Sequence, residues 1–151
     1  MRHNPAKNKR FYLVDTWDDV RSWGKDIAPT LSPCVVMESG VEGSMEGGKM
    51  YRDYPVYFCV RARKMADGEA AAEAKEEAFV HAAKFLMWLL QKHNDDAPNG
   101  DYGRINMEDT IPIGTAGPLQ DGWYGVLVQL SRLELMNLCV DEDLYMGESE
   151  D

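Results

Sequence analysis

The longest periodic pattern of apolar residues runs from about Asp67 to His93 and predicts one long helix. Asp67 is a suitable N-cap for it, and Glu69 adds a negative charge to the first turn. The predicted core stripe of this helix consists of Phe79, Ala82, Ala83, Leu86, Leu89 and Leu90.

The second half of this helix has no polar side. Residues 85–90 (FLMWLL) are apolar all round, and such a helix has to be covered on more than one side. In a chain of 151 residues, the second cover is either a wrapped-over segment or another subunit. At 100° per residue, Trp88 projects beside Glu77, His81 and Lys84. It therefore either covers a neighbouring segment or anchors a partner, because aromatic residues are enriched at interface centres.

Shorter runs predict five strands. From Val56 to Arg63, apolar residues alternate with a second set that ends in Arg61 and Arg63, which predicts a strand with one buried face and a basic patch on the other. The other predicted strands span residues 11–14, 34–37, 105–113 and 123–136. Trp123 and Tyr124, at the start of the last strand, pose the same alternative as Trp88.

A Gly-rich, charged stretch at residues 39–54 is either a long hairpin or an open loop on an assembly surface, where Lys49 and Tyr51 would make contacts. Gly43 to Lys49 has the spacing of a phosphate-binding loop. However, Met50 replaces the Ser or Thr that holds magnesium, and a strand rather than a helix follows. We therefore expect no nucleotide site here.

The order of elements predicts an α+β fold, with an antiparallel sheet and one long helix packed on a face. A short N-terminal helix is expected from Trp17 to about Ile27, capped by Asp15-Thr16 and ended by Pro29. We divide the chain into a basic N-terminal arm (1–10), a single α+β domain (11–140) that includes the Gly-rich loop at 39–54, and an acidic C-terminal tail (141–151).

Charge and hydropathy narrow the classes of function. The net charge is −10, although residues 1–10 carry a local +4 and residues 141–151 a local −6. An acidic body disfavours general binding to nucleic acid. The oppositely charged ends are either solvated tails or meet within one subunit or between neighbours. The longest apolar run, about six residues, is far below the ~20 of a membrane span, and no signal peptide is recognisable, so we expect an intracellular protein.

No residue pattern predicts a catalytic, cofactor or metal site. Cys34, Cys59 and Cys139 are widely spaced and lie in or beside apolar segments, which is typical of buried structural thiols. The acidic pairs at 95–96 and 108–109 are outside the apolar segments that would shift their pKa values. We therefore expect a protein that is not an enzyme and has no cofactor.

The order of PVYFCVRAR (55–63), an Ala-rich helix, DTIPI (109–113) and GWYGVLVQL (122–130) resembles that of the tail-terminator and tail-completion (neck) proteins of tailed bacteriophages. The likeness covers about residues 30–138 and consists of element order and spacing. It implies a small α+β protein, made in the host cytoplasm, that forms a ring, commonly a hexamer, between tail tube and head connector. It also implies that DNA passes through an acidic lumen without specific recognition.

The leading hypothesis is thus a non-enzymatic structural subunit of the virion, a homo-oligomer that also contacts tail-tube and connector proteins. The ring would form through strand edges and the Trp88 face. The expected interface residues are Trp88, His81, Lys84, Arg61, Arg63, Trp123, Tyr124, Lys49 and Tyr51. The alternatives are a cytoplasmic adaptor or small-ligand-binding domain, and a metal-dependent hydrolase that uses Asp95, Asp96, Glu108 or Asp109.

Overall fold

A computed structural model of the protein describes residues 10–27, 29–39, 42–63, 67–96, 105–107 and 110–133. The strands of this part are β1 (Phe11–Val14), β2 (Cys34–Glu38), β3 (Gly43–Glu46), β4 (Lys49–Arg61), β5 (Ile113–Ala116) and β6 (Trp123–Leu133). The helices are α1 (Trp17–Trp23) and α2 (Gly68–Asp96), with short 3-10 turns η1 (Gly24–Asp26), η2 (Pro29–Leu31) and η4 (Gln120–Gly122).

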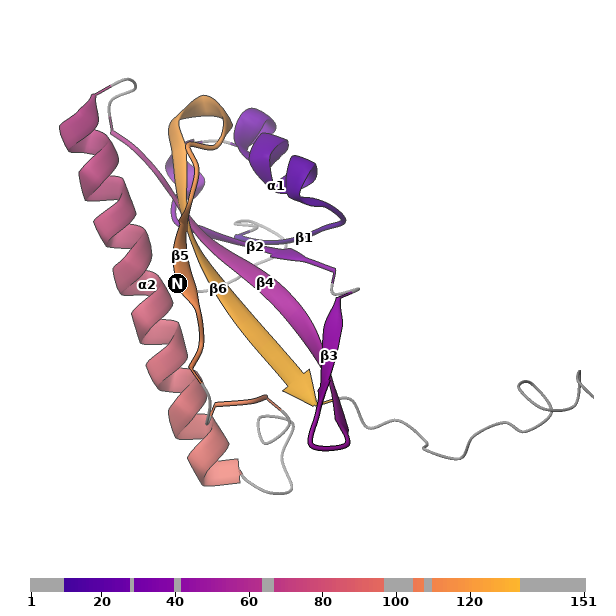
Figure 1. Ribbon diagram of the computed structural model, residues 1–151. Coiled ribbons are helices and arrows are strands. Elements are labelled where there is room, and N and C mark those ends of the chain that lie inside the picture. The colour runs from indigo at the N-terminus through magenta and orange to yellow at the C-terminus, as the bar shows by residue number, and fades with distance from the viewer. Residues whose placement is uncertain are drawn as a thin grey trace, which may run out of the picture.

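The strands form one sheet in the order β1-β2-β4-β6-β5, and β3 pairs with the first part of β4. All described pairs are antiparallel except β1 with β2. Helix α2 lies along one face of the sheet and α1 on the other (Figure 1). The predicted α+β class, with a long helix on one face and a short N-terminal helix, is confirmed. None of the described helices is long and apolar enough to cross a membrane.

The Gly-rich stretch is a hairpin. Strands β3 and β4 are joined by Gly47 and Gly48, whose φ angles of 58° and 77° suit glycine and match the tight turns that connect two twisted strands. Of the two interpretations of residues 39–54, the hairpin is therefore correct and the open loop is wrong. Strand β4 begins at Lys49 rather than after Pro55, because it continues as a partner of both β3 and β6.

Both faces of β4 are buried, not one as predicted. Val56, Phe58 and Val60 pack under α2, whereas Tyr57 and Cys59 pack in the second core cluster, with Val20 of α1 and with Leu119 and Trp123. The alternation of residue types was correct, but the second cover could not be seen locally because it comes from distant segments.

Helix α2 matches the predicted helix, and Asp67 accepts hydrogen bonds through Oδ1 from the backbone N–H groups of Glu69 (3.0 Å) and Ala70 (3.4 Å). The predicted core stripe is partly wrong. Of its members, Ala82 and Leu89 are buried, whereas Phe79 is 47% exposed; Ala74 and Ala78, which were not part of the predicted stripe, are buried as well. Small alanine side chains let the helix approach the sheet closely, and this approach, rather than side-chain size, sets which side of the helix faces inward.

Helix α1 begins as predicted. The Thr16 hydroxyl accepts from the backbone N–H of Asp19, whose carboxylate accepts from the backbone N–H of Thr16 in return. At its described positions, the predicted strand at 105–113 is wrong: Ile105 makes one isolated bridge to Arg132, and β5 begins at Ile113. The proline before β5, Pro112, has no N–H to give to a ladder. Most of the N-terminal arm and the whole C-terminal tail are outside the described residues, as are positions 134–136 of the last predicted strand.

Candidate functional site: an apolar groove between the first strand and the long helix

The sheet is wider than the helix that covers it. Helix α2 packs over β4 and β6, so β2 and the edge strand β1 extend beyond it. Side chains alternate along β1, and Phe11 and Leu13 fall on the face that α2 occupies. They are 41% and 61% exposed. A strip of apolar sheet is thus left beside the helix.

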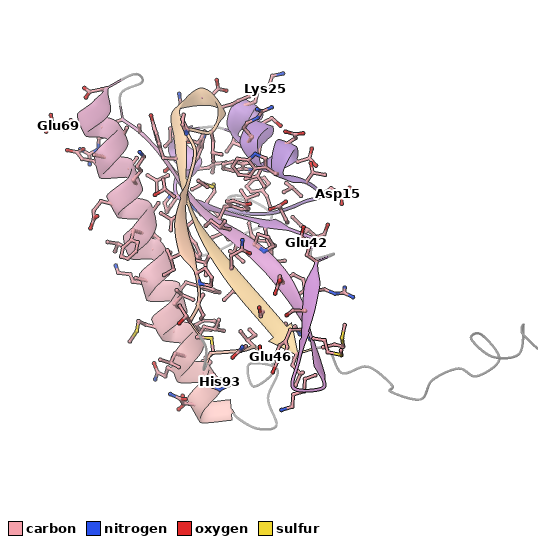
Figure 2. All side chains as sticks on the ribbon, in the orientation of Figure 1. Asp15, Lys25, Glu42, Glu46, Glu69 and His93 are labelled. Atoms are coloured by element: carbon pink, nitrogen blue, oxygen red, sulfur yellow. The ribbon has the colours of Figure 1, made fainter. Side chains whose placement is uncertain are left out.

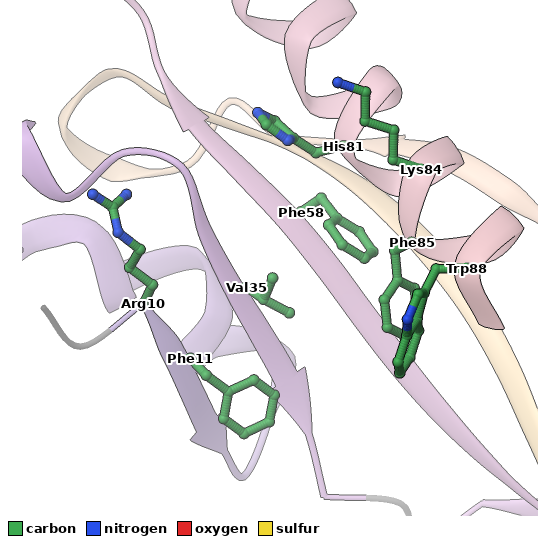
Figure 3. A pocket seen from close by; sticks show the side chains of 8 residues that line it. All are labelled: Arg10, Phe11, Val35, Phe58, His81, Lys84, Phe85 and Trp88. Atoms are coloured by element: carbon green, nitrogen blue, oxygen red, sulfur yellow. The ribbon is translucent and has the colours of Figure 1, made fainter. Parts of the chain in front are cut away.

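This strip and the flank of α2 enclose a groove of about 460 Å³. Its floor consists of Val35, Phe58 and Phe85, with Phe11 and Trp88 on opposite sides (Figure 3). The ring centroids of Phe58 and Phe85 are 5.4 Å apart, and those of Phe85 and Trp88 are 6.1 Å apart. Trp88 remains 45% exposed, which leaves much of its ring available to a further contact.

The ionisable residues at the groove are of basic types. Arg10, His81 and Lys84 line it, and the described lining residues include no carboxylate. The Arg10 guanidinium is fixed by hydrogen bonds that Nη1 donates to the carbonyls of Leu31 (2.7 Å) and Pro33 (3.0 Å). His81 Nε2 lies 3.6 Å from a Glu77 carboxylate oxygen outside the groove. On a protein of net charge −10, basic side chains beside an apolar floor make the groove suitable for a group that is both apolar and negatively charged.

Three of the predicted interface residues, Trp88, His81 and Lys84, meet at this groove. Sequence reasoning missed Arg10 and Phe11, because residues 1–10 were treated as an arm and 11–14 only as a strand. The sequence offered one half of the signal, since all four residues of Phe11–Val14 are apolar, as in an interior strand. The structure supplies the other half, because it places this strand at the sheet edge. One of its two apolar faces was therefore left to be explained.

The other predicted interface residues lie elsewhere. The Trp123 side chain is fully buried on the α1 side of the sheet, so its prediction as an interface residue is wrong. Its indole ring packs against Gly24 and fills the core there. Tyr124 packs at the edge of the α2 core, with Lys75 Nζ 5.6 Å from its ring centroid. The remaining four are at the ends of β4: Arg61 and Arg63 at one end, Lys49 and Tyr51 in the hairpin.

A second cavity, of about 200 Å³, is acidic and lies on the α1 side of the sheet. Asp15, Glu38, Glu42 and Asp53 line it, and Asp15 and Glu42 are on the same side of the molecule in Figure 2. Tyr57 donates a hydrogen bond of 2.6 Å to Glu38, and burial together with this bond raises the pKa of Tyr57. In the part of the chain that the structure describes, no three acidic, histidine or cysteine side chains are placed to hold a metal ion.

The structure describes only some of the residues that the metal-dependent hydrolase alternative would use. Asp95 is exposed near the end of α2. The side chain of Asp96, and Glu108 and Asp109 as a whole, fall outside the described residues, so this alternative stays an untested prediction.

Two of the cysteines are buried thiols, as predicted. Cys34 and Cys59 are directly opposite each other on β2 and β4, and both are free and fully buried. Burial raises the pKa of Cys34 to about 11 and raises that of Cys59 as well. Neither thiol is thus suited to nucleophilic chemistry near neutral pH. Cys139 is outside the described residues.

Comparison with known proteins adds no identity to this geometry: neither a protein-family model nor a curated protein matches the sequence.

Proposed function

We propose that the protein is a non-enzymatic structural subunit that assembles into a ring at the neck or tail terminus of a tailed-phage virion, in contact with tail-tube and connector proteins. The order of elements along the chain carries the resemblance to that family. The α+β fold, with a long helix against an antiparallel sheet, agrees with what the resemblance implies.

The observation that carries the proposal is the exposed apolar surface beside the first sheet edge. Phe11 and Leu13 of β1, with Met87 and Trp88 of α2, are between 41% and 67% exposed. Phe11 and Trp88 line the same groove, Leu13 is on the same face of β1 as Phe11, and Met87 lines a second hollow together with Trp88. Exposed apolar residues that adjoin in this way mark contacts between proteins.

The two edges of the sheet support a ring rather than a simple dimer. Strands β1 and β5 are at opposite ends of the strand order, and each has an exposed large apolar residue, Leu13 at 61% and Ile113 at 42%. If β1 of one copy meets β5 of the next, the contact uses two different surfaces, and contacts of that kind build a ring when the rotation between successive copies closes.

Light scattering coupled to size-exclusion chromatography tests this proposal. The full-length protein is expected to elute at a multiple of 17.1 kDa. Leu13→Asp should shift it toward the single-chain mass, because a carboxylate would be forced into an apolar contact. Phe79→Asp is the matched control, since Phe79 is 47% exposed on α2 but does not line the groove and is on neither edge strand. A single-chain mass at high micromolar concentration, unchanged by Leu13→Asp and also unchanged when purified tail tubes are added, would refute the ring.

The groove itself favours a second candidate, a binding domain for a small amphipathic anion. An apolar floor with Arg10 and Lys84 at its margin fits an alkyl chain that ends in a carboxylate. Calorimetry with a medium-chain fatty acid and with the alcohol of equal length separates the two functions. Tight, carboxylate-dependent binding to a single-chain protein would favour the binding domain over the ring subunit.

A further inference from the structure

The hairpin of β3 and the first part of β4 is an exposed arm with an apolar tip. It extends from the end of the sheet (Figure 1), residues 42–50 are all exposed, and among the described strands β3 pairs with β4 alone. Met45 and Met50 are directly opposite each other in this ladder, so their side chains share one face of the hairpin, where they are 71% and 37% exposed. Two adjoining apolar side chains on an extended arm indicate a contact with another molecule.

The hairpin cannot place these side chains in the groove of its own copy. The groove floor includes Phe58, which is eight residues after Met50 along the same strand, β4. Eight strand residues span about 27 Å, which is several times the length of a methionine side chain. The distance is fixed, because β4 runs unbroken between the two positions and pairs with β6 from Tyr51 onward. A contact between the hairpin and this type of groove therefore joins two copies.

The groove between β1 and α2 has the chemistry that methionine side chains fit. Its lining is aromatic, with Phe11 and Trp88 on opposite sides of Phe58 and Phe85 (Figure 3). Methionine is flexible and unbranched, so it fills irregular apolar spaces, and its sulfur makes favourable contacts with aromatic rings. The apolar tip of the hairpin and the floor of the groove are thus suited to each other.

The charges of the two surfaces are complementary as well. Glu46 is next to Met45 at the tip, and residues 42–53 carry three carboxylates against two basic groups. The groove has Arg10 and Lys84 at its margin and no carboxylate among its described lining residues. Two bodies of net charge −10 repel each other, but the approach of Glu46 to these two basic groups is attractive. Charge therefore favours this groove as the place where a second copy docks.

We infer that the hairpin of one copy inserts Met45 and Met50 into the groove between β1 and α2 of the next copy. Glu46 then lies beside Arg10 and Lys84 of that copy. Hairpin and groove are different surfaces, so each copy gives a hairpin on one side and receives one on the other, as a ring requires. This inference rests on the proposed ring and names a contact that stabilises it in addition to the sheet edges.

Photo-cross-linking of the full-length protein tests the contact. A benzophenone amino acid in place of Met45 should give covalent dimers at high micromolar concentration, and peptide mass spectrometry should map them to the segments around Phe11 and Trp88. The same probe in place of Phe79 is the control, because Phe79 is 47% exposed on α2 but does not line the groove. The yield of dimers with the probe at residue 45 should exceed the yield with the probe at residue 79 by about tenfold.

Matched variants identify the groove as the receiving surface. Trp88→Ala should lower the yield from the probe at residue 45 by about three- to tenfold, the size of one lost aromatic contact, and Phe79→Ala should leave it unchanged. Lys84→Glu should lower the yield too, because the new carboxylate repels Glu46. Lys75→Glu is the control for that change, since Lys75 is nine residues away on α2 and thus on the opposite side of the helix. Circular dichroism confirms that each variant is folded.

Mixing isotope-labelled and unlabelled protein identifies the donor of the hairpin. Cross-linked peptides with mixed labels are expected. Same-copy products alone, an absence of covalent dimers, or a yield that Trp88→Ala leaves unchanged would overturn the inference.

The mass in solution is read separately, so the contact and the ring can fail independently. If multimers form but the cross-links map outside the groove, the hairpin contact is wrong and the ring stands. If the cross-links map to the groove in a protein that forms dimers and nothing larger, the contact stands and the ring is wrong.

Discussion

Gly24 is the position where the smallest substitution should have a large effect on stability. It follows α1, and a Cβ atom there would lie 2.4 Å from Cδ1 and 2.8 Å from Nε1 of Trp123. The Trp123 side chain cannot move aside easily, because it is fully buried and its ring centroid is 4.8 Å from that of Trp23. Gly24→Ala therefore forces the indole or the turn to move by about 1 Å to reach ordinary contact distance.

The magnitude is set by two opposing effects. The φ angle of Gly24 is −69°, which alanine adopts without strain, so the substitution also restricts the unfolded chain and stabilises the fold by about 0.4–1 kcal/mol. Overpacking of a core costs about 1–3 kcal/mol. The clash is the larger effect, and we expect Gly24→Ala to lower the free energy of unfolding by about 1–2 kcal/mol.

Urea unfolding followed by circular dichroism measures this change as a lower midpoint at an unchanged slope. The expected fall in Tm is about 3–6 °C for a domain of this size. Gly68→Ala is the control, because Gly68 begins α2 and a Cβ there would meet nothing within 4 Å. A Gly24→Ala protein as stable as the Gly68→Ala protein would show that the packing of Trp123 against the glycine is not what limits residue 24.

Two further changes in stability follow from the structure. Thr16→Ala removes the hydroxyl that accepts from the Asp19 backbone N–H, which is one half of the α1 capping box, and should cost about 1 kcal/mol in urea unfolding. Ser22→Ala should cost almost nothing, because the Ser22 hydroxyl only bonds back to the Asp18 carbonyl, and equal effects of the two substitutions would refute the cap. Because burial raises the pKa of Cys34 to about 11, its thiol ionises more readily in the unfolded chain, so its stabilising effect is complete below pH 9 and is lost as pH rises toward 11. In Cys34→Ala the fall in unfolding free energy across this range should be shallower by up to about 1.4 kcal/mol per pH unit, and an identical slope would contradict the raised pKa.

Local patterns were sufficient for most of the elements. The spacing of apolar residues located α2, the alternation in residues 56–63 located the centre of β4, and Asp15-Thr16 located the start of α1. These features depend on neighbours within one or two turns or on strand alternation, so the sequence alone carries them. The same reasoning failed at residues 105–113, where the described positions before Ile113 make one isolated bridge, Ile105 with Arg132, instead of a strand.

Only the α2 side of the groove could be predicted from the sequence, because only that side depends on local helical geometry. Trp88, His81 and Lys84 share one side of a helix, and helical geometry alone groups them. Arg10 and Phe11 join them only because β1 pairs in parallel with β2 and thereby reaches the sheet edge beside α2. No local pattern encodes the strand order, since it depends on contacts between residues far apart along the chain.

By itself, then, the sequence determined the α+β class, the long helix with its unusual apolar second half, and the acidic character with oppositely charged ends. The tertiary structure alone decided which aromatic residues are core and which are surface. Trp123 is buried because Gly24 comes to it from another element, and Phe79 is exposed because alanines set the contact of α2 with the sheet. Both outcomes depend on how closely two backbones approach, and that distance is a property of the packed molecule rather than of any stretch of chain.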